Sequence, residues 1–151
     1  NNAIGAIPRL LNLGIPGFLL SPAINIIIAQ RLVRRLCEKC KKKVRASKEI
    51  QELIEKELKG IKKIEEPLYI WEPEGCDQCN KEGFSGRIGI FEILEMTPEL
   101  SEIIIKNPTE TKIIQEAEKQ GMITMMQDGF LKALEGITTV EEVLRVTSAF
   151  E

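Results

Sequence analysis

The chain has 151 residues, of which 43% are hydrophobic and 29% are charged, an ordinary globular composition far from that of disordered chains. Its length suits one domain, or one domain with a small appendage. The net charge of −2 argues against nucleic-acid binding by the whole surface, and no apolar run reaches the roughly 18 residues needed to span a bilayer.

The N-terminal part predicts two helices followed by a strand. Residues 3–13 place their apolar side chains on one helical side and end at a glycine. Ser21 followed by Pro22 is a helix-start signal, so we expect a second helix from there to about Gln30. Apolar and charged residues then alternate over 31–36, which indicates a strand, although a continued helix is also compatible with them.

The middle of the chain predicts one helix and two strands. Ser47 can cap a helix over about 48–59, and a short strand over 69–71 follows. A second strand is expected over 87–94. We expect it to pair antiparallel with strand 31–36, which would place the residues between them at the tip of an elaborated hairpin.

The remaining residues are predicted to be helical. Helices are expected over about 98–107, 110–120, 125–135 and 140–147, and each follows a threonine that can act as its N-cap. The last two begin with possible capping boxes, Thr-x-x-Gln and Thr-x-x-Glu. The predicted fold class is therefore α+β and mainly helical, with a small antiparallel sheet.

All four cysteines fall into two Cys-x-x-Cys pairs, Cys37 with Cys40 and Cys76 with Cys79. The two-residue gap lets both thiolates of a pair converge on one ion, and two pairs complete a tetrahedral shell. The sequence holds no histidine, so an all-cysteine site is the soft-ligand site that this chain can offer. We therefore predict a structural zinc site with these four cysteines as ligands.

Two alternatives stay open for the cysteines. They could form two disulfides, which the matched pairs and the lack of a secretory signal disfavour. They could also bind iron as rubredoxin does, although Lys41 and Asn80 stand where a glycine would be expected.

The cations around the first pair could stabilise an anionic zinc–thiolate cluster or form a solvated basic loop. These cations are Arg34, Arg35, Lys39, Lys41, Lys42 and Lys43.

The sequence offers no catalytic machinery of its own. It contains neither a Gly-x-x-x-x-Gly-Lys-Ser/Thr phosphate loop nor a histidine for general acid–base work. A zinc ion with four thiolates has no open position for a water molecule. We expect that this chain by itself catalyses no reaction.

Several stretches resemble the ATPases that drive type II secretion and type IV pilus extension, in the same order and spacing. They are residues 28–37 (IAQRLVRRLC), 75–79 (GCDQC), 83–92 (GFSGRIGIFE), 121–124 (GMIT), 128–129 (DG) and 136–145 (GITTVEEVLR). These stretches are spread over nearly the whole chain. The cysteines exclude the zinc-free branch that retracts pili.

The resemblance implies that the chain, which begins with Asn-Asn, is the C-terminal part of such an ATPase, with the Walker motifs upstream. Residues 1–36 and 87–95 would form the C-terminal edge of a RecA-like core. Residues 37–86 would be a tetracysteine zinc subdomain, and residues 96–151 a helical subdomain. The apolar side chains of the first part, including Ile27 and Val33, exceed what a two-strand hairpin can bury, so we expect the rest of the core or another copy to cover them.

The resemblance also implies cofactors and partners. The parent would bind ATP and magnesium, and Arg87 would lie close to the nucleotide; an ion pair of Arg87 with Glu92 or Glu95 is the alternative. The parent would be a cytoplasmic hexamer at the inner membrane, without a transmembrane segment, and would contact inner-membrane platform proteins.

The second functional hypothesis is a free-standing zinc-ribbon module that binds nucleic acid or protein through the basic run from Arg31 to Arg45. The acidic net charge and the 5% aromatic content disfavour nucleic acid.

Overall fold

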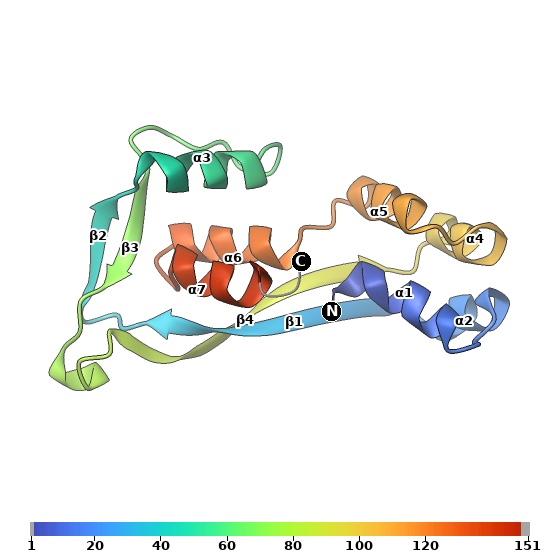
Figure 1. Cartoon of the computed structure of the whole chain (residues 1–151), viewed down its shortest axis with the longest axis horizontal. Helices are drawn as coiled ribbons and strands as arrows, with labels where there is room; N and C mark the ends of the chain where they lie inside the picture. The colour runs from blue at the N-terminus through green and yellow to red at the C-terminus, as the bar shows by residue number, and fades with distance from the viewer. Residues whose placement is uncertain (1, 149–151) are drawn as a thin grey trace. The chain divides into compact units, whose positions relative to one another are not determined.

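The computed structural model describes residues 2–148, which contain seven α-helices and four β-strands (Figure 1). The fold class is α+β, as predicted. In chain order the elements are α1 (Ala3–Asn12), α2 (Gly17–Ala23), β1 (Ile26–Leu36), β2 (Lys41–Arg45), α3 (Lys48–Glu57), β3 (Tyr69–Pro73), a 3₁₀ turn (Asp77–Cys79), β4 (Phe84–Glu95), α4 (Pro98–Lys106), α5 (Glu110–Lys119), α6 (Met125–Leu134) and α7 (Val140–Thr147). Within residues 2–148, no helix combines the length and the apolar character that crossing a bilayer requires.

The strands form two sheets of two strands each, β1 with β4 and β2 with β3, so the predicted pairing of 31–36 with 87–94 is confirmed. The residues divide into two compact units. Unit 1 comprises Asn1–Gln30 and Phe91–Thr124, and unit 2 comprises Arg31–Ile90 and Met125–Glu151. These units group the elements differently from the three parts expected for a full-length ATPase, and that three-part division stays a prediction.

Unit 1 is a helical cluster on the first half of β1 and the last part of β4. Its core joins α1, α2, α4 and α5 through side chains that include Ile7, Leu20, Leu100 and Ile113. Two helix starts follow the capping signals in the sequence: the Asn2 Oδ1 accepts from the Gly5 N–H at 2.7 Å, and the Thr97 Oγ1 accepts from the Leu100 N–H at 3.2 Å. The carboxylate of Glu92 accepts the Ala3 N–H at 2.8 Å, which anchors the start of α1.

The second predicted helix is wrong in both bounds. The helix begins at Gly17 instead of Pro22, and Ile26 already belongs to β1. The β-branched run Ile26–Ile28 favours extended backbone, which explains the early strand. A Cβ at Gly17 would lie 2.6 Å from the Ile104 carbonyl oxygen, so the glycine lets α2 approach α4 closely.

Period-two alternation gives β1 and β4 one exposed apolar side in unit 1. The exposed side chains there are Ile26, Ile28, Phe91 and Ile93. Ile27 instead packs against the helices of unit 1, and in unit 2 the side chain of Val33 is fully buried. Exposed apolar side chains are present on these strands as expected, but Ile27 and Val33, which were expected to need cover from outside the chain, pack within it.

Unit 2 has one core that joins the segment between the cysteine pairs to the last two helices. Ile54 and Leu58 from α3 and its end, and Ile70 from β3, pack with Phe130 of α6 and Val143 of α7. The predicted helix cap at Ser47 is confirmed, since its Oγ accepts from the Ile50 N–H at 3.3 Å. The segment between the cysteine pairs therefore buries its apolar face against α6 and α7.

The turn between α6 and α7 runs along the end of β1. The Leu36 N–H donates to the Ile137 carbonyl at 2.8 Å, and the Thr138 hydroxyl donates to the Arg34 carbonyl at 2.8 Å. Gly136 takes a φ of +74°, and a Cβ there would lie 2.8 Å from the Trp71 ring. Backbone bonds and this close contact therefore hold β1, β3 and the α6–α7 turn together.

Glu142 in the first turn of α7 is a buried carboxylate held by two arginines. Arg34 donates through its backbone N–H at 3.0 Å and its Nη2 at 2.7 Å, and Arg145 donates through Nε at 3.1 Å and Nη2 at 2.9 Å. Burial disfavours the charged form, but the hydrogen bonds from Arg145 and Arg34 outweigh it and lower the pKa of Glu142 to about 2. Of the predicted capping box, one bond is present, since the Thr139 hydroxyl oxygen accepts from the Glu142 N–H. The Glu142 side chain accepts from Arg34 of β1 instead of from its own helix start.

We expect Glu142→Gln to destabilise the protein at pH 7 by about 2 kcal/mol. This value is smaller than the lowered pKa alone would suggest, because both arginines are half exposed and solvent screens their interaction with Glu142. The pKa of Glu142 is lowered in the folded state, so its contribution is present above the ordinary carboxyl pKa of about 4.5 and is lost as the pH falls toward 2. Urea unfolding at pH 7 and at pH 3 measures this. Glu141→Gln, an exposed neighbour in the same turn, is the matched control. A Glu142→Gln deficit that stays constant down to pH 3 would contradict the assignment.

Candidate metal centre

The first cysteine pair lies in the turn between β1 and β2 of unit 2. Cys37 follows the last residue of β1, and Cys40 precedes the first residue of β2. The Cys37 carbonyl accepts from the Cys40 N–H at 3.3 Å and from the Lys41 N–H at 3.0 Å. This turn reverses the chain and places both cysteines on its inner side, where they are buried.

The second pair lies between β3 and β4, on the 3₁₀ turn that starts after Cys76. The Lys81 N–H donates to the Cys76 carbonyl at 2.8 Å, and Asn80 and Lys81 have φ angles of 52° and 65°. Gly75 has a φ of +92°, and a Cβ there would lie 2.6 Å from the Lys81 carbonyl oxygen. The left-handed residues and the glycine together close the turn tightly enough to bring both sulfurs to one side.

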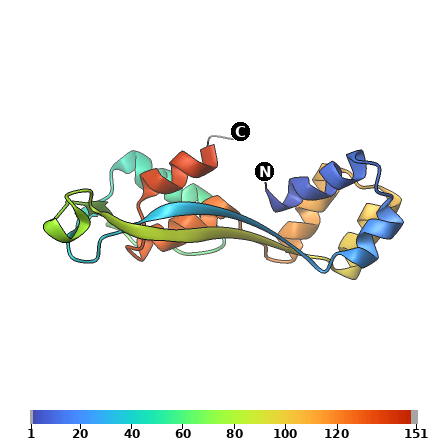
Figure 2. The same ribbon diagram turned by 90° about the horizontal axis from the view of Figure 1, so that it is seen from below.

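The two turns lie side by side (Figure 2) and bring all four sulfur atoms together. The Sγ–Sγ distances are 3.9 Å for Cys37–Cys76, 3.7 Å for Cys40–Cys79 and 3.7 Å for Cys76–Cys79. A regular tetrahedron with metal–sulfur bonds of about 2.3 Å requires separations of about 3.8 Å. No disulfide joins them, since all four thiols are free. The four cysteines predicted from the sequence are therefore positioned to bind one metal ion.

Hydrogen bonds prepare one of these sulfurs for the thiolate form. The N–H groups of Cys76 and Gly83 each donate to the Cys79 Sγ at 3.2 Å and lower the pKa of Cys79 to about 6. Burial raises the pKa of Cys40 to about 12, so that thiol ionises only when a cation is present to pair with it. Metal binding here would release protons, as expected for thiolate ligands.

Three of the six cations around the first cysteine pair form ion pairs with carboxylates. Lys41 lies 2.6 Å and Arg35 3.5 Å from Glu38, and Arg34 pairs with Glu142. Lys41 also donates to the Gly136 carbonyl at 3.0 Å. Within residues 2–148, none of the six cations hydrogen-bonds a cysteine sulfur. Their expected role in neutralising the cluster therefore rests on their proximity in sequence alone.

The structure also adds residues that the sequence analysis did not assign to the site. Gly83 donates to Cys79, and its carbonyl accepts the Cys37 N–H at 3.0 Å, so it links the two cysteine turns. A Cβ at Gly83 would lie 2.3 Å from the Pro73 Cβ. The glycines that flank the second pair at positions 75 and 83 were the available signal. Glycine is required at these two positions because of close contacts that the spacing of the cysteines does not reveal.

Arg87, the residue expected to contact a nucleotide, is not part of the cysteine cluster. It is exposed on β4, and it makes no ion pair within the described residues. Its guanidinium is therefore available to an anionic ligand, and the nucleotide contact expected for it stays a prediction.

The chain is similar to known proteins over almost its entire length. Residues 1–145 match the family described as type II/IV secretion system protein. The type IV pilus assembly ATPase PilB of Pseudomonas aeruginosa is 41% identical over 97% of this chain and 25% of its own length. PilB of Myxococcus xanthus is 38% identical over 98% of this chain and 26% of its own length. The type II secretion system ATPase E of Vibrio cholerae is 40% identical over 97% of this chain and 28% of its own length.

The chain thus spans about a quarter of the length of these curated relatives. The matched region includes residues of both compact units and the segment that carries the four cysteines. The chain belongs to the type II/IV secretion system protein family.

Proposed function

We propose that the chain is the C-terminal metal-binding and helical part of a hexameric cytoplasmic ATPase that powers type IV pilus assembly or type II secretion. The observation that carries this proposal is the similarity over 97% of the chain to about a quarter of proteins named as such ATPases. The chain has no phosphate loop of its own, so hydrolysis would depend on residues outside it. Its partners would be further copies and inner-membrane platform proteins of the machine.

The three-part division is part of the proposal. Residues 1–36 with 87–95 form the edge of a RecA-like core, 37–86 the zinc subdomain and 96–151 the helical subdomain. The exposed apolar side of the strands, with Ile26, Ile28, Phe91 and Ile93, supports an edge that another part of the core covers.

We assign zinc to the four-cysteine cluster and ATP with magnesium to the whole ATPase. Cys37, Cys40, Cys76 and Cys79 would hold the zinc ion, and four thiolates in a closed tetrahedral shell suit a structural role. Zinc bound there would crosslink the β1–β2 turn to the β3–β4 turn. Arg87 would lie beside the nucleotide phosphates, where an exposed guanidinium can pair with an oxyanion.

We expect ATP hydrolysis by the longer protein and none above background by this chain alone, because nothing here cradles phosphates or holds magnesium. In the longer protein, Arg87→Ala should lower kcat/KM for ATP about tenfold, with Lys62→Ala on an exposed loop as control. Steady turnover by the purified chain would refute the proposal. An unchanged KM and kcat in Arg87→Ala would remove Arg87 from the nucleotide site and leave the rest standing.

We expect Cys76→Ala, or removal of the metal by a chelator, to loosen unit 2 and spare unit 1. Losing one ligand opens the closed shell, and metal affinity contributes directly to folding of such modules. Amide hydrogen exchange should speed up in β2, β3 and α3, with α1 and α4 unchanged. Ser85→Ala, an exposed residue close to the second pair in sequence, is the control. Equal exchange in β2 and β3 with and without the metal would show that the pairing of these two strands does not depend on the metal.

A further inference from the structure

The β2–β3 ribbon presents two different faces. In its register Val44 lies opposite Ile70, and these two side chains pack on the core of unit 2. Directly opposed residues share a face, so the pairs Lys43 with Trp71 and Arg45 with Tyr69 lie on the other one. That second face is basic and aromatic, and Tyr69 is 45% exposed.

The ribbon also has an open strand edge. The sheet holds two strands, and β3 is the one in contact with α6, so β2 is the outer strand (Figure 1). The unpaired backbone groups of an outer strand are a template for another strand. Four of the five residues of β2 are basic. Lys41 pairs with Glu38, whereas Lys42, Lys43 and Arg45 form no ion pair within residues 2–148.

The charge of this edge selects what can pair with it. A second copy of β2 would place lysines and arginines opposite one another, which disfavours pairing between copies. An acidic strand would instead bring carboxylates beside Lys43 and Arg45 on the outer face and beside Lys42, which lies opposite Glu72 in the register without forming an ion pair with it. We infer that the outer edge of β2 binds an extended acidic segment of a partner protein by strand addition, a function beyond the ATPase role proposed above.

Two other anionic partners fit the ribbon less well. The Lys43 ammonium lies over the Tyr69 ring at 5.3 Å and over the Trp71 ring at 5.9 Å, and Lys41 lies over Trp71 at 5.0 Å. Lysines therefore occupy ring faces on which the bases of single-stranded nucleic acid would have to stack.

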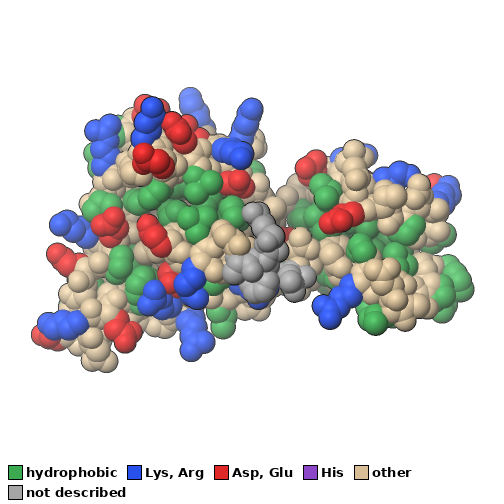
Figure 3. Space-filling view, viewed as in Figure 1, with side chains coloured by type: hydrophobic (Ala, Val, Ile, Leu, Met, Phe, Trp, Pro, Cys, Tyr) green, Lys and Arg blue, Asp and Glu red, His purple; other side chains and the backbone are tan. Residues whose placement is uncertain are grey.

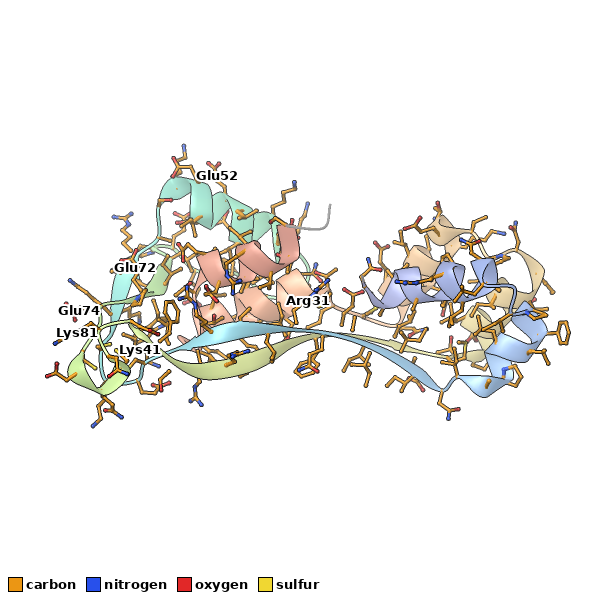
Figure 4. All side chains as sticks on the ribbon, turned by 60° about the horizontal axis from the view of Figure 1, so that its bottom comes forward. Arg31, Lys41, Glu52, Glu72, Glu74 and Lys81 are labelled. Carbon is orange, nitrogen blue, oxygen red and sulfur yellow. The ribbon has the colours of Figure 1, made fainter. Side chains whose placement is uncertain are left out.

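A lipid surface is disfavoured for a different reason. The aliphatic side chains of the ribbon, Val44 and Ile70, pack on the core, so no aliphatic group on the outer face could enter a bilayer. Figure 4 labels Glu72 on β3 and Glu74, which directly follows that strand. Figure 3 shows acidic and basic side chains mixed on the visible side of unit 2. Such a mixture would weaken attraction to a uniformly anionic membrane, but an acidic strand could still pair with the edge of β2.

The test uses the full chain with its metal and a fluorescent peptide of about eight alternating Glu and Thr residues, a length typical of strands. Fluorescence anisotropy should show binding that weakens with salt, and Lys43→Glu with Arg45→Glu should raise the Kd at least about tenfold. The milder pair Lys43→Gln with Arg45→Gln should give a smaller rise, and circular dichroism checks that each variant folds. Lys62→Glu with Lys63→Glu, the same charge change on exposed positions of unit 2, should leave the Kd unchanged.

Amide exchange then separates strand addition from simple charge attraction. Bound peptide should protect alternate amides of β2 and leave those of α3 unchanged, because an added strand takes up the outward-facing N–H groups. No peptide binding, an equal loss in the Lys62 and Lys63 control, or binding without protection of β2 would each overturn the inference. Tighter binding of oligothymidylate, or of vesicles rich in phosphatidylglycerol, would overturn it in favour of nucleic acid or membrane.

Discussion

Convergence of the Cys37, Cys40, Cys76 and Cys79 sulfurs is the constraint on which unit 2 depends. The segment between the pairs consists of a two-stranded ribbon and one helix, and a two-stranded ribbon is marginal by itself. Drawing the cysteine turns together closes this segment into a loop, so that less chain entropy opposes its folding. The sulfur spacing matches a tetrahedral shell, and the left-handed turn after Cys79 positions the second pair for it. The metal would therefore set the geometry from which β2 and β3 leave the site.

The effect of this constraint reaches the C-terminal helices, because the ribbon and the helices share one core. Trp71 packs on Gly136, and Lys41 donates to the carbonyl of the same residue. From Gly136 the α6–α7 turn follows the end of β1 and leads into α7. There the buried carboxylate of Glu142 accepts a hydrogen bond from Arg34 of β1. An unbroken series of backbone bonds, ring contact and ion pair thus joins the cysteine turns to α7. Change at the metal centre is expected to alter the packing of α6 and α7, and this coupling stays inside unit 2.

Local signals predicted the elements and the cysteine cluster, whereas contacts distant in sequence decided what was missed. Ser47 and Thr97 cap their helices as predicted, because capping is a property of a few neighbouring residues. Ser21 has the same residue type but is buried against Ser101, so packing overrode its capping signal. The division of the helices between two cores could not be predicted, because helical periodicity shows that a face is apolar without showing which face it meets. The cluster of four cysteines could be predicted because the spacing within each pair is typical of a chelate.

We propose that one metal ion joins the two cysteine turns as a closed four-sulfur site. X-ray absorption at the zinc edge, on protein purified without added metal and quantified for metal content, tests it most directly. We expect one zinc per chain and a shell of four sulfur scatterers at about 2.3 Å. A shell containing oxygen or nitrogen, an iron ion in place of zinc, or metal-free protein with intact β2 and β3 would contradict it.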